Sequence, residues 1–253
     1  MKPFLLKFAI ALALSFLPAT ADELRVSAAA SLSETMTEIS ELHLKSHGEK
    51  LVLNFGGSNA LARQIKEGAP CDLFFSADEA TLKQLLAEDL LHTNSVTNLL
   101  GNALVVITPS ESPLQIKSAA DLTSVKRLAL GDPAAVPAGV YARKWLESQD
   151  VWKAIEPKVV ATENVRGALA AVASGNVDAG VVYKTDAMTS KEVSVAYEVP
   201  ADQAPPIIYP IAATKSSKDP GKAIRFIAFL RTEEVAAVFR KHGFVPLPPP
   251  TAP

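Results

Sequence analysis

The chain has 253 residues, of which 25 are basic and 27 acidic, so its net charge is −2. This balance argues against nucleic acid as a partner, because surfaces that bind nucleic acid are basic. A single cysteine excludes an internal disulfide, so the fold must be held together by a hydrophobic core, which a chain of this length can easily form.

The N-terminal segment has the three parts of a secretory signal peptide. Lys2 and Lys7 flank the start of an apolar run over residues 8–17, which is followed by a proline and by an A-x-A cleavage site ending at Ala21. The run is too short for a permanent membrane span, which needs about 20 apolar residues. We therefore favour cleavage after Ala21 over an uncleaved anchor, so that residues 1–21 are a signal peptide and the mature protein is exported to the periplasm.

Short apolar runs alternate with helical patterns along the rest of the chain. The expected strands are Leu24–Ser27, Leu51–Phe55, Leu73–Ser76, Leu104–Ile107, Leu128–Leu130, Lys158–Ala161 and Gly180–Tyr183. The expected helices are Leu32–Ser46, Asn59–Glu67, Glu79–Ala87, Val140–Ser148 and Val165–Ser174. This alternation predicts an α/β fold with mainly parallel sheets flanked by helices, in which ligands bind beyond the carboxyl ends of the strands.

Two apolar stretches, residues 99–109 and 204–214, could carry the chain between two lobes and back. The expected division is a lobe 1 of residues 22–101 and 209–253, and a lobe 2 of residues 102–208. A final helix over Pro220–Arg240 would complete lobe 1. Two crossings form a two-strand hinge, and a hinge between two lobes lets them close around a ligand.

Two stretches share one pattern, in which a short strand leads through small residues to a serine and then to an amphipathic helix. They are Arg25–Met36, which contains Ser31, and Leu51–Ile65, which contains Ser58. A helix start presents backbone N–H groups and about half a positive charge, which favours an anion. Plain N-capping is the alternative for each serine. The glycine pair before Ser58 favours binding, because glycine lets a ligand approach the backbone closely.

Three positions in the expected lobe 2 could complete an anion site. The loop after the strand that ends at Leu130 leads into a helix start where Ala138 offers a backbone N–H, and Val165 lies in the first turn of another helix. Tyr183 ends a strand, and its phenol can donate a hydrogen bond at neutral pH. A plain loop and an ordinary packed aromatic residue are the alternatives.

Other polar residues have simpler interpretations. Arg63 and Arg166 could clamp an anion, but we favour surface or inter-lobe salt bridges because the helix starts already supply donors. His43 and His47 have the spacing of half a metal site without an evident third ligand, which favours a solvated helix face. We interpret Cys71 as a small buried residue rather than a nucleophile.

Known catalytic motifs are missing from the sequence. It contains no G-x-S-x-G elbow, no H-E-x-x-H motif and no phosphate loop ending in Gly-Lys-Ser/Thr. The serines described above have no evident histidine partner. We therefore predict a binding protein and not an enzyme.

Taken together, these motifs closely resemble the periplasmic molybdate-binding proteins of ABC importers, the ModA family. The segments that carry the resemblance are Ala28–Leu32, Gly68–Asp78, Gly131–Gly139, Asn164–Leu169, Gly180–Tyr183 and Arg240–Phe244. They occur in the family's order over essentially the whole mature chain. The resemblance implies a two-lobe type II periplasmic-binding-protein fold, no cofactor, and a tetrahedral molybdate or tungstate dianion held by neutral donors.

The family's ligand contacts carry over one position at a time. The resemblance implies side-chain contacts from Ser31, Ser58 and Tyr183, and backbone contacts from Ala138 and Val165. The chain has Gly-Gly-Ser-Asn around Ser58, where the family often has more serines. Cys71 replaces a residue that is usually small and inert, which leaves a free thiol without affecting the expected contacts.

The resemblance also implies partners. We expect a monomeric receptor that delivers the oxyanion to a membrane permease driven by a cytoplasmic ATPase. A receptor for another small oxyanion, such as sulfate, or for a carboxylate is the nearer alternative, and a secreted hydrolase is the more distant one.

Overall fold

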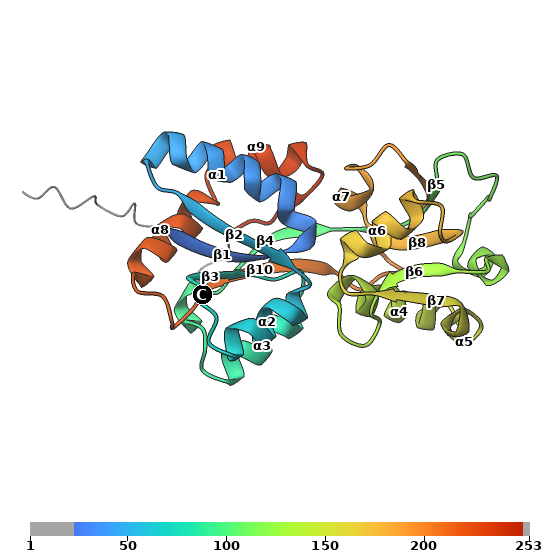
Figure 1. Ribbon diagram of the computed structural model, residues 1–253, viewed down its shortest axis with the longest axis horizontal. Helices are drawn as coiled ribbons and strands as arrows, with labels where there is room; N and C mark the ends of the chain where they lie inside the picture. Colours follow the sequence, from blue (N-terminus) through green and yellow to red (C-terminus); the bar gives the residue numbers. More distant parts are fainter. Residues whose placement is uncertain (1–22, 250–253) are drawn as a thin grey trace, which may run out of the picture.

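A computed structural model describes residues 23–249 of the chain, so the expected signal peptide at residues 1–21 lies outside the described residues. Two α/β lobes lie one beside the other along the longest axis of the molecule (Figure 1). No helix among residues 23–249 is both long enough and apolar enough to cross a membrane.

The first lobe is built on a mixed sheet of six strands. They are β1 (Leu24–Ala29), β2 (Leu51–Gly56), β3 (Leu73–Phe75), β4 (Thr97–Asn102), β10 (Ile207–Ala213) and β11 (Val245–Pro246), in the order β11-β4-β10-β3-β1-β2. β1 pairs in parallel with β2 and β3, whereas the pairings β10–β3, β10–β4 and β11–β4 are antiparallel. The mainly parallel sheet expected from the sequence is thus confined to the half formed by β1, β2 and β3.

Helices cover both faces of this sheet. They are α1 (Ser33–His47), α8 (Pro220–Phe229) and α9 (Glu233–Lys241) on one face and α2 (Ser58–Lys66) and α3 (Glu79–Ala87) on the other (Figure 1). The α1 helix buries Met36, Ile39 and His43, and α2 buries Leu61 and Ile65. These spacings of three and four residues place the buried side chains on one stripe of each helix, which faces the sheet.

The single helix expected over Pro220–Arg240 is wrong, because two helices cover this segment. The first ends at Phe229 and the second begins at Glu233. The Thr232 hydroxyl caps the second helix by accepting a hydrogen bond from the Val235 N–H at 3.5 Å. Two glutamates in the following turn complement the helix dipole, so the local sequence favours a new helix start here.

The second lobe contains a mixed sheet of five strands. They are β5 (Leu104–Pro109), β6 (Leu128–Gly131), β7 (Val159–Thr162), β8 (Ala179–Tyr183) and β9 (Val193–Glu198), in the order β7-β6-β8-β5-β9. The helices of this lobe are α4 (Pro137–Ser148), α5 (Trp152–Ile155), α6 (Val165–Ala173) and α7 (Lys184–Ala187). β6 is parallel to β7 and β8, and β5 is antiparallel to both its neighbours. The apolar run of β5 is buried on both faces, as is typical of a central strand.

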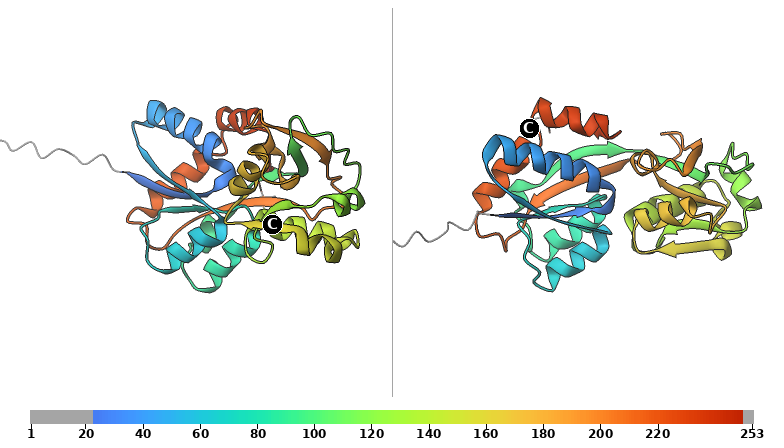
Figure 2. Two further views of the ribbon diagram at one scale, coloured as in Figure 1. Left: turned by 45° about the vertical axis from the view of Figure 1, so that its right-hand side comes forward. Right: turned by 45° about the horizontal axis from the view of Figure 1, so that its top comes forward.

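The chain passes between the two sheets twice. It runs from β4 directly into β5 through Ala103, and it returns from β9 to β10 through residues 199–206. The views in Figure 2 show both connections beside each other between the lobes. The α/β two-lobe fold expected from the sequence is confirmed, with mixed sheets in both lobes.

Candidate functional site

A small pocket lies where the two lobes meet. It is lined by Ala29, Ala30, Ser31, Gly56, Gly57, Ser58, Ala77, Val136, Pro137, Ala138, Asn164, Val165 and Tyr183. Its cavity volume is only about 10 Å³, far below the range of roughly 300–1,000 Å³ that is usual for drug-sized ligands. None of these lining residues has a charged side chain, so any ion held here must be held by neutral groups.

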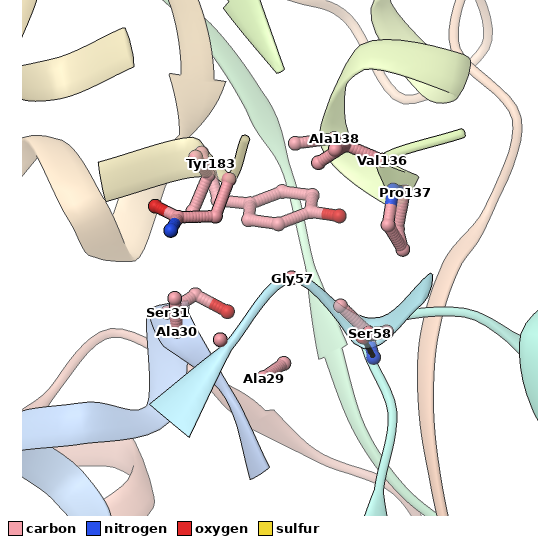
Figure 3. Close-up of a pocket in the computed structure, with 13 residues that line it drawn as sticks. Ala29, Ala30, Ser31, Gly57, Ser58, Val136, Pro137, Ala138 and Tyr183 are labelled. Atoms are coloured by element: carbon pink, nitrogen blue, oxygen red, sulfur yellow. Dashed lines mark hydrogen bonds between the residues drawn. The ribbon is translucent and has the colours of Figure 1, made fainter. Parts of the chain in front are cut away.

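The pocket brings together all five residues that the sequence analysis singled out. Ser31 and Ser58 line it from the first lobe, and Ala138, Val165 and Tyr183 line it from the second. Figure 3 shows the two serines on one side of the space and Tyr183 and Ala138 on the other. The lining residues follow the carboxyl ends of parallel strands, which is the usual place for ligands in such sheets.

Ser58 is the first residue of α2, but its side chain does not cap the helix. Gly57 occupies the N-cap position, where it makes no side-chain hydrogen bond. The Ser58 Oγ instead accepts a hydrogen bond from the Ala77 N–H at 3.0 Å. The Ala77 N–H uses only a lone pair of the Ser58 oxygen. The hydrogen of the Ser58 hydroxyl is therefore available to an acceptor in the pocket.

Ser31 does not cap a helix either. It lies in a 3-10 turn, Ala30–Leu32, directly before α1, and the capping positions of the turn and of α1 make no side-chain hydrogen bond. The Ser31 Oγ lies 2.9 Å from the Tyr209 hydroxyl, which belongs to β10. The capping alternative is therefore wrong for both serines.

Tyr183 ends β8 and presents its hydroxyl at the pocket. The residue is 1% exposed, and its hydroxyl has no hydrogen-bond partner among the described residues. Burial raises its pKa well above the usual value of 10, so the phenol keeps its proton at neutral pH. An unpartnered donor in a buried position is costly unless a ligand satisfies it.

Two helix starts supply backbone donors from the second lobe. Ala138 lies in the first turn of α4, after Pro137, and Val165 is the first residue of α6. The N–H groups of a first turn have no partner within their own helix. Asn164 caps α6 by accepting a hydrogen bond from the Gly167 N–H at 3.0 Å, and this bond fixes the direction of the turn.

Glycines allow the backbone to approach closely at two places. A Cβ on Gly139 would lie 1.8 Å from the Gly131 carbonyl oxygen, so only glycine lets α4 start directly against the end of β6. A Cβ on Gly57 would lie 2.7 Å from the carbonyl oxygen of Glu163, which belongs to the other lobe. The two lobes therefore touch at the rim of the pocket.

The electrostatics of the pocket favour an anion. The N-terminal ends of α2, α4 and α6 all meet it, and each carries a partial positive charge from the helix dipole. Three hydroxyls lie among these helix ends, from Ser31, Ser58 and Tyr183. The pocket can thus surround a small oxyanion with neutral donors.

Arg63 and Arg166 do not line the pocket. Arg166, on α6, bridges the lobes by donating from Nη1 to the Oε1 of Glu34 on α1 at 3.0 Å and from Nη2 to Oε2. Its Nε lies 2.7 Å from Oδ1 of the fully buried Asp186. Burial raises the pKa of Asp186 to about 7, although the charge of Arg166 acts to lower it. The favoured interpretation of Arg166 as an inter-lobe salt bridge is confirmed.

The expectation of a solvated face for His43 and His47 is wrong for the first of them. His43 is 3% exposed and packs against the rings of Phe226 and Phe229. His47 is exposed, and its ring stacks on His43. Among residues 23–249 no group of histidine, cysteine and acidic side chains could hold a metal ion. The helix therefore uses His43 for packing.

Cys71 is buried, as the sequence analysis expected. Its thiol is 3% exposed and donates a hydrogen bond to the Leu73 carbonyl oxygen at 3.0 Å. Burial also raises its pKa, which disfavours the reactive thiolate.

Two residues near the site had no signal in the sequence. Tyr209 on β10 contacts Ser31, and Asn102 at the end of β4 contacts Tyr209 at 3.2 Å. Both lie in strands that the sequence analysis treated only as crossings between lobes. Their partners are distant in sequence, and a hydrophobic strand pattern does not show where a tyrosine hydroxyl points.

Comparison with known proteins gives consistent results. The family described as bacterial extracellular solute-binding protein matches residues 24–245. The molybdate-binding protein of Escherichia coli is 38% identical over 234 residues, which cover 89% of this chain and 91% of that protein.

Solved structures show the same similarity. A substrate-binding domain from Clostridium difficile, assigned to a molybdenum ABC transporter, is 37% identical and superimposes with a TM-score of 0.70, covering 89% of this chain and 99% of that one. The periplasmic molybdate-binding protein of Azotobacter vinelandii, at 23% identity and a TM-score of 0.80, covers 89% of this chain and 99% of that one. At that identity the second structure supports the fold alone.

Proposed function

The chain belongs to the family of bacterial extracellular solute-binding proteins, and on this premise we propose that it is a periplasmic receptor that captures molybdate for an ABC importer. The similarity to molybdate-binding proteins extends over most of the chain. We include tungstate as a ligand, because it is also a tetrahedral dianion of nearly the same size.

The observation that carries this proposal is that the pocket offers several neutral hydrogen-bond donors and no charged side chain. Its three hydroxyls can each point a hydrogen at a ligand, and the helix starts at Ala138 and Val165 add backbone N–H groups. A fully deprotonated oxyanion accepts hydrogen bonds from every direction and needs no acceptor from the protein. Hydrogen phosphate carries a proton that needs an acceptor, and no carboxylate lines the pocket.

We propose that Ser31 and Ser58 hold the oxyanion from lobe 1, and that Ala138, Val165 and Tyr183 hold it from lobe 2. The proposed lobes are residues 22–101 with 209–253 and residues 102–208. Because the contacts come from both lobes, the ligand stabilises the closed arrangement relative to an open one.

The remaining features of the proposal concern the exported protein. Cleavage after Ala21 releases a monomer into the periplasm, where it delivers its ligand to a permease driven by a cytoplasmic ATPase. It needs no cofactor and does not turn its ligand over. The hydrogen-bond partners of Ser31 and Ser58 are Tyr209 and a backbone amide, and neither is a base that activates a nucleophile.

A receptor for a carboxylate is less well supported. Such a site usually offers an arginine fork to its ligand. Arg166 is already engaged by Glu34 and Asp186, and Arg63 is exposed on α2 outside the pocket. Replacing Arg63 with alanine should therefore leave binding unchanged.

Calorimetric titration of the protein with molybdate, tungstate, sulfate and phosphate tests the proposal. We expect tight binding of molybdate and tungstate, and much weaker binding of sulfate, whose shorter bonds leave the donors out of reach. Phosphate should bind weakest, because of its proton. Sulfate binding as tight as molybdate would contradict the assigned selectivity, and no binding of any of the four would contradict the function.

A further inference from the structure

Ser31 is connected to both strands that join the lobes. Its Oγ lies 2.9 Å from the hydroxyl of Tyr209 on β10. Asn102, at the end of β4, donates from Nδ2 to the same Tyr209 hydroxyl at 3.2 Å and to the Thr185 Oγ1 at 2.9 Å. All of these residues except Asn102, which is partly buried, are at most 3% exposed, so water does not compete freely for the bonds.

The orientation of the Asn102 amide follows from its surroundings. Its Oδ1 accepts a hydrogen bond from the Ala103 N–H at 2.9 Å. A backbone N–H can only donate, so the oxygen of the amide must face it and the NH₂ group must face Tyr209 and Thr185. Asn102 is therefore a donor to the Tyr209 hydroxyl.

The hydrogen bond from Asn102 favours Tyr209 as the donor in its contact with Ser31. The Tyr209 hydroxyl receives a hydrogen from Asn102, and the remaining group within hydrogen-bond distance among the described residues is the Ser31 Oγ. Burial raises the pKa of Tyr209 well above 10, so its hydroxyl keeps a hydrogen to donate. Either hydroxyl can donate in the contact between Tyr209 and Ser31, and donation from Tyr209 leaves the hydrogen of Ser31 free for a ligand.

We propose that Tyr209 is a positioning residue for the ligand, because its hydroxyl, oriented by Asn102, fixes Ser31 as a hydrogen-bond donor to the bound oxyanion. This inference rests on the proposed function. The chain of donors runs from the Asn102 amide through the Tyr209 hydroxyl to the Ser31 hydroxyl and ends on the anion. Donors aligned in this way polarise one another, so each bond strengthens the next.

Ser58 provides an internal comparison. Its oxygen accepts from the Ala77 N–H, which can only donate, so the backbone fixes its direction. No backbone N–H among the described residues donates to the Ser31 hydroxyl, and a free hydroxyl could equally turn its lone pair toward the anion. The side chain of Tyr209 thus fixes the direction of the Ser31 hydroxyl, as the backbone N–H of Ala77 fixes that of Ser58.

The test is a double-mutant cycle on the whole exported protein, with molybdate as the titrant. Tyr209→Phe retains the ring and its packing against Tyr183 and Phe244, at centroid distances of 5.7 and 5.4 Å, and removes only the hydroxyl. We expect about a fivefold to tenfold weaker molybdate binding, in the range of one neutral hydrogen bond. Tyr197→Phe, on β9 beside Trp145, is the matched control and should bind as the wild type does.

The second part of the experiment distinguishes whether the Tyr209 hydroxyl positions Ser31 or only contributes to packing. In a Ser31→Ala background, Tyr209→Phe should cause no further loss of affinity, because the hydroxyl it positions is already gone. Equal losses in both backgrounds, or unchanged binding by Tyr209→Phe alone, would overturn the inference. Wild-type protein that does not bind molybdate would instead contradict the proposed function, so the two failures are distinct. Thermal unfolding without ligand verifies that each variant is folded.

Discussion

At the scale of single residues, the pocket is lined by three hydroxyl groups, which come from Ser31, Ser58 and Tyr183. Ser58 accepts from a backbone amide, Ser31 contacts Tyr209, and the Tyr183 hydroxyl has no partner among the described residues. A buried polar group without a partner raises the free energy of the ligand-free protein. We therefore expect the Tyr183 hydroxyl to destabilise the ligand-free protein while it strengthens ligand binding.

Replacing Tyr183 with phenylalanine should reveal this conflict. We expect roughly 10-fold to 100-fold weaker molybdate binding, because a hydrogen bond to a charged group contributes about 1.5–3 kcal/mol. The melting temperature of the ligand-free protein should stay the same or rise, since the variant buries no unpartnered hydroxyl. Calorimetry and thermal unfolding measure the two effects. Unchanged affinity would remove Tyr183 from the proposed site.

The sequence located these residues but did not determine what they do. A strand, small residues and a helix start are visible locally, so Ser31, Ser58 and Tyr183 could be found without a structure. The capping alternative for the serines could not be rejected in the same way. Ser31 contacts a residue 178 positions away, and no local pattern reports such a partner.

At the scale of elements, helix starts are the units that present backbone donors. The α6 helix illustrates how the local sequence achieves this, because Asn164 caps the Gly167 N–H and leaves Val165 at the first helical position. An alanine substitution cannot test a backbone contact. A proline at this position deletes the N–H while remaining compatible with the helix.

Val165→Pro should therefore weaken molybdate binding without unfolding α6. We expect a loss of about 10-fold or more, as for one hydrogen bond to a charged group. The preceding Asn164 has φ −161° and ψ 173°, an extended conformation that a following proline permits. Calorimetry measures the affinity, and circular dichroism measures the helix content.

A matched control exists on α9. Glu233 is likewise the first residue of a helix capped by a side chain, and Thr232 before it is extended at φ −67° and ψ 153°. Glu233→Pro should leave molybdate binding unchanged, because α9 does not line the pocket. Equal affinities of the two proline variants would show that the Val165 N–H does not contact the ligand.

At the scale of the whole molecule, the pocket exists because the lobes approach each other at a few defined contacts. One is the rim at Gly57, which faces the Glu163 carbonyl. Another is the bridge from Glu34 through Arg166 to Asp186. Each should change ligand affinity by changing the stability of the closed arrangement.

Gly57→Ala should keep the lobes from closing fully. Its Cβ would lie 2.7 Å from a backbone oxygen and 2.8 Å from Asn59 Oδ1, and the backbone oxygen cannot turn away. We expect about tenfold weaker molybdate binding, because overpacking of this kind costs about 1–3 kcal/mol. X-ray scattering should show a smaller decrease in the radius of gyration on addition of molybdate.

Gly101→Ala serves as the control for this substitution. A Cβ at Gly101 would have its nearest neighbours at 3.7 Å, which is ordinary contact. This variant should bind molybdate and close as the wild type does. Full closure by Gly57→Ala would show that the rim contact does not limit the approach of the lobes.

Glu34→Gln should weaken binding through the bridge between lobes. The variant leaves Arg166 paired with the buried Asp186, so the second lobe stays intact. Because the Glu34 side chain is 46% exposed, solvent screens the pair and we expect only a twofold to fivefold loss, about the upper range for an exposed ion pair. The difference from the wild type should shrink at high salt.

The control for the charge change is Glu147→Gln. Glu147 pairs with Arg143 within α4, at 2.7 Å, and does not connect the lobes. Its molybdate affinity should equal that of the wild type at both salt concentrations. If Glu34→Gln shows no loss at low salt, the ion pair does not contribute to closure.

The sequence alone determined the positions where donors could meet an anion, because strand ends and helix starts are set by short-range patterns of apolar, small and capping residues. It also indicated the α/β class and the two crossings. The sequence predicted one C-terminal helix where the structure has two, because the apolar pattern continues past the cap at Thr232.

Only the tertiary structure decided how these positions act. It placed Tyr209 against Ser31 and a backbone amide against Ser58, and it brought both serines to one pocket without a capping role. It paired Arg166 with Glu34, 132 residues away, and so separated this cation from the pocket. The physical reason is the same in each case: a hydroxyl or a charge takes its role from its nearest partner, and these partners come from distant parts of the chain.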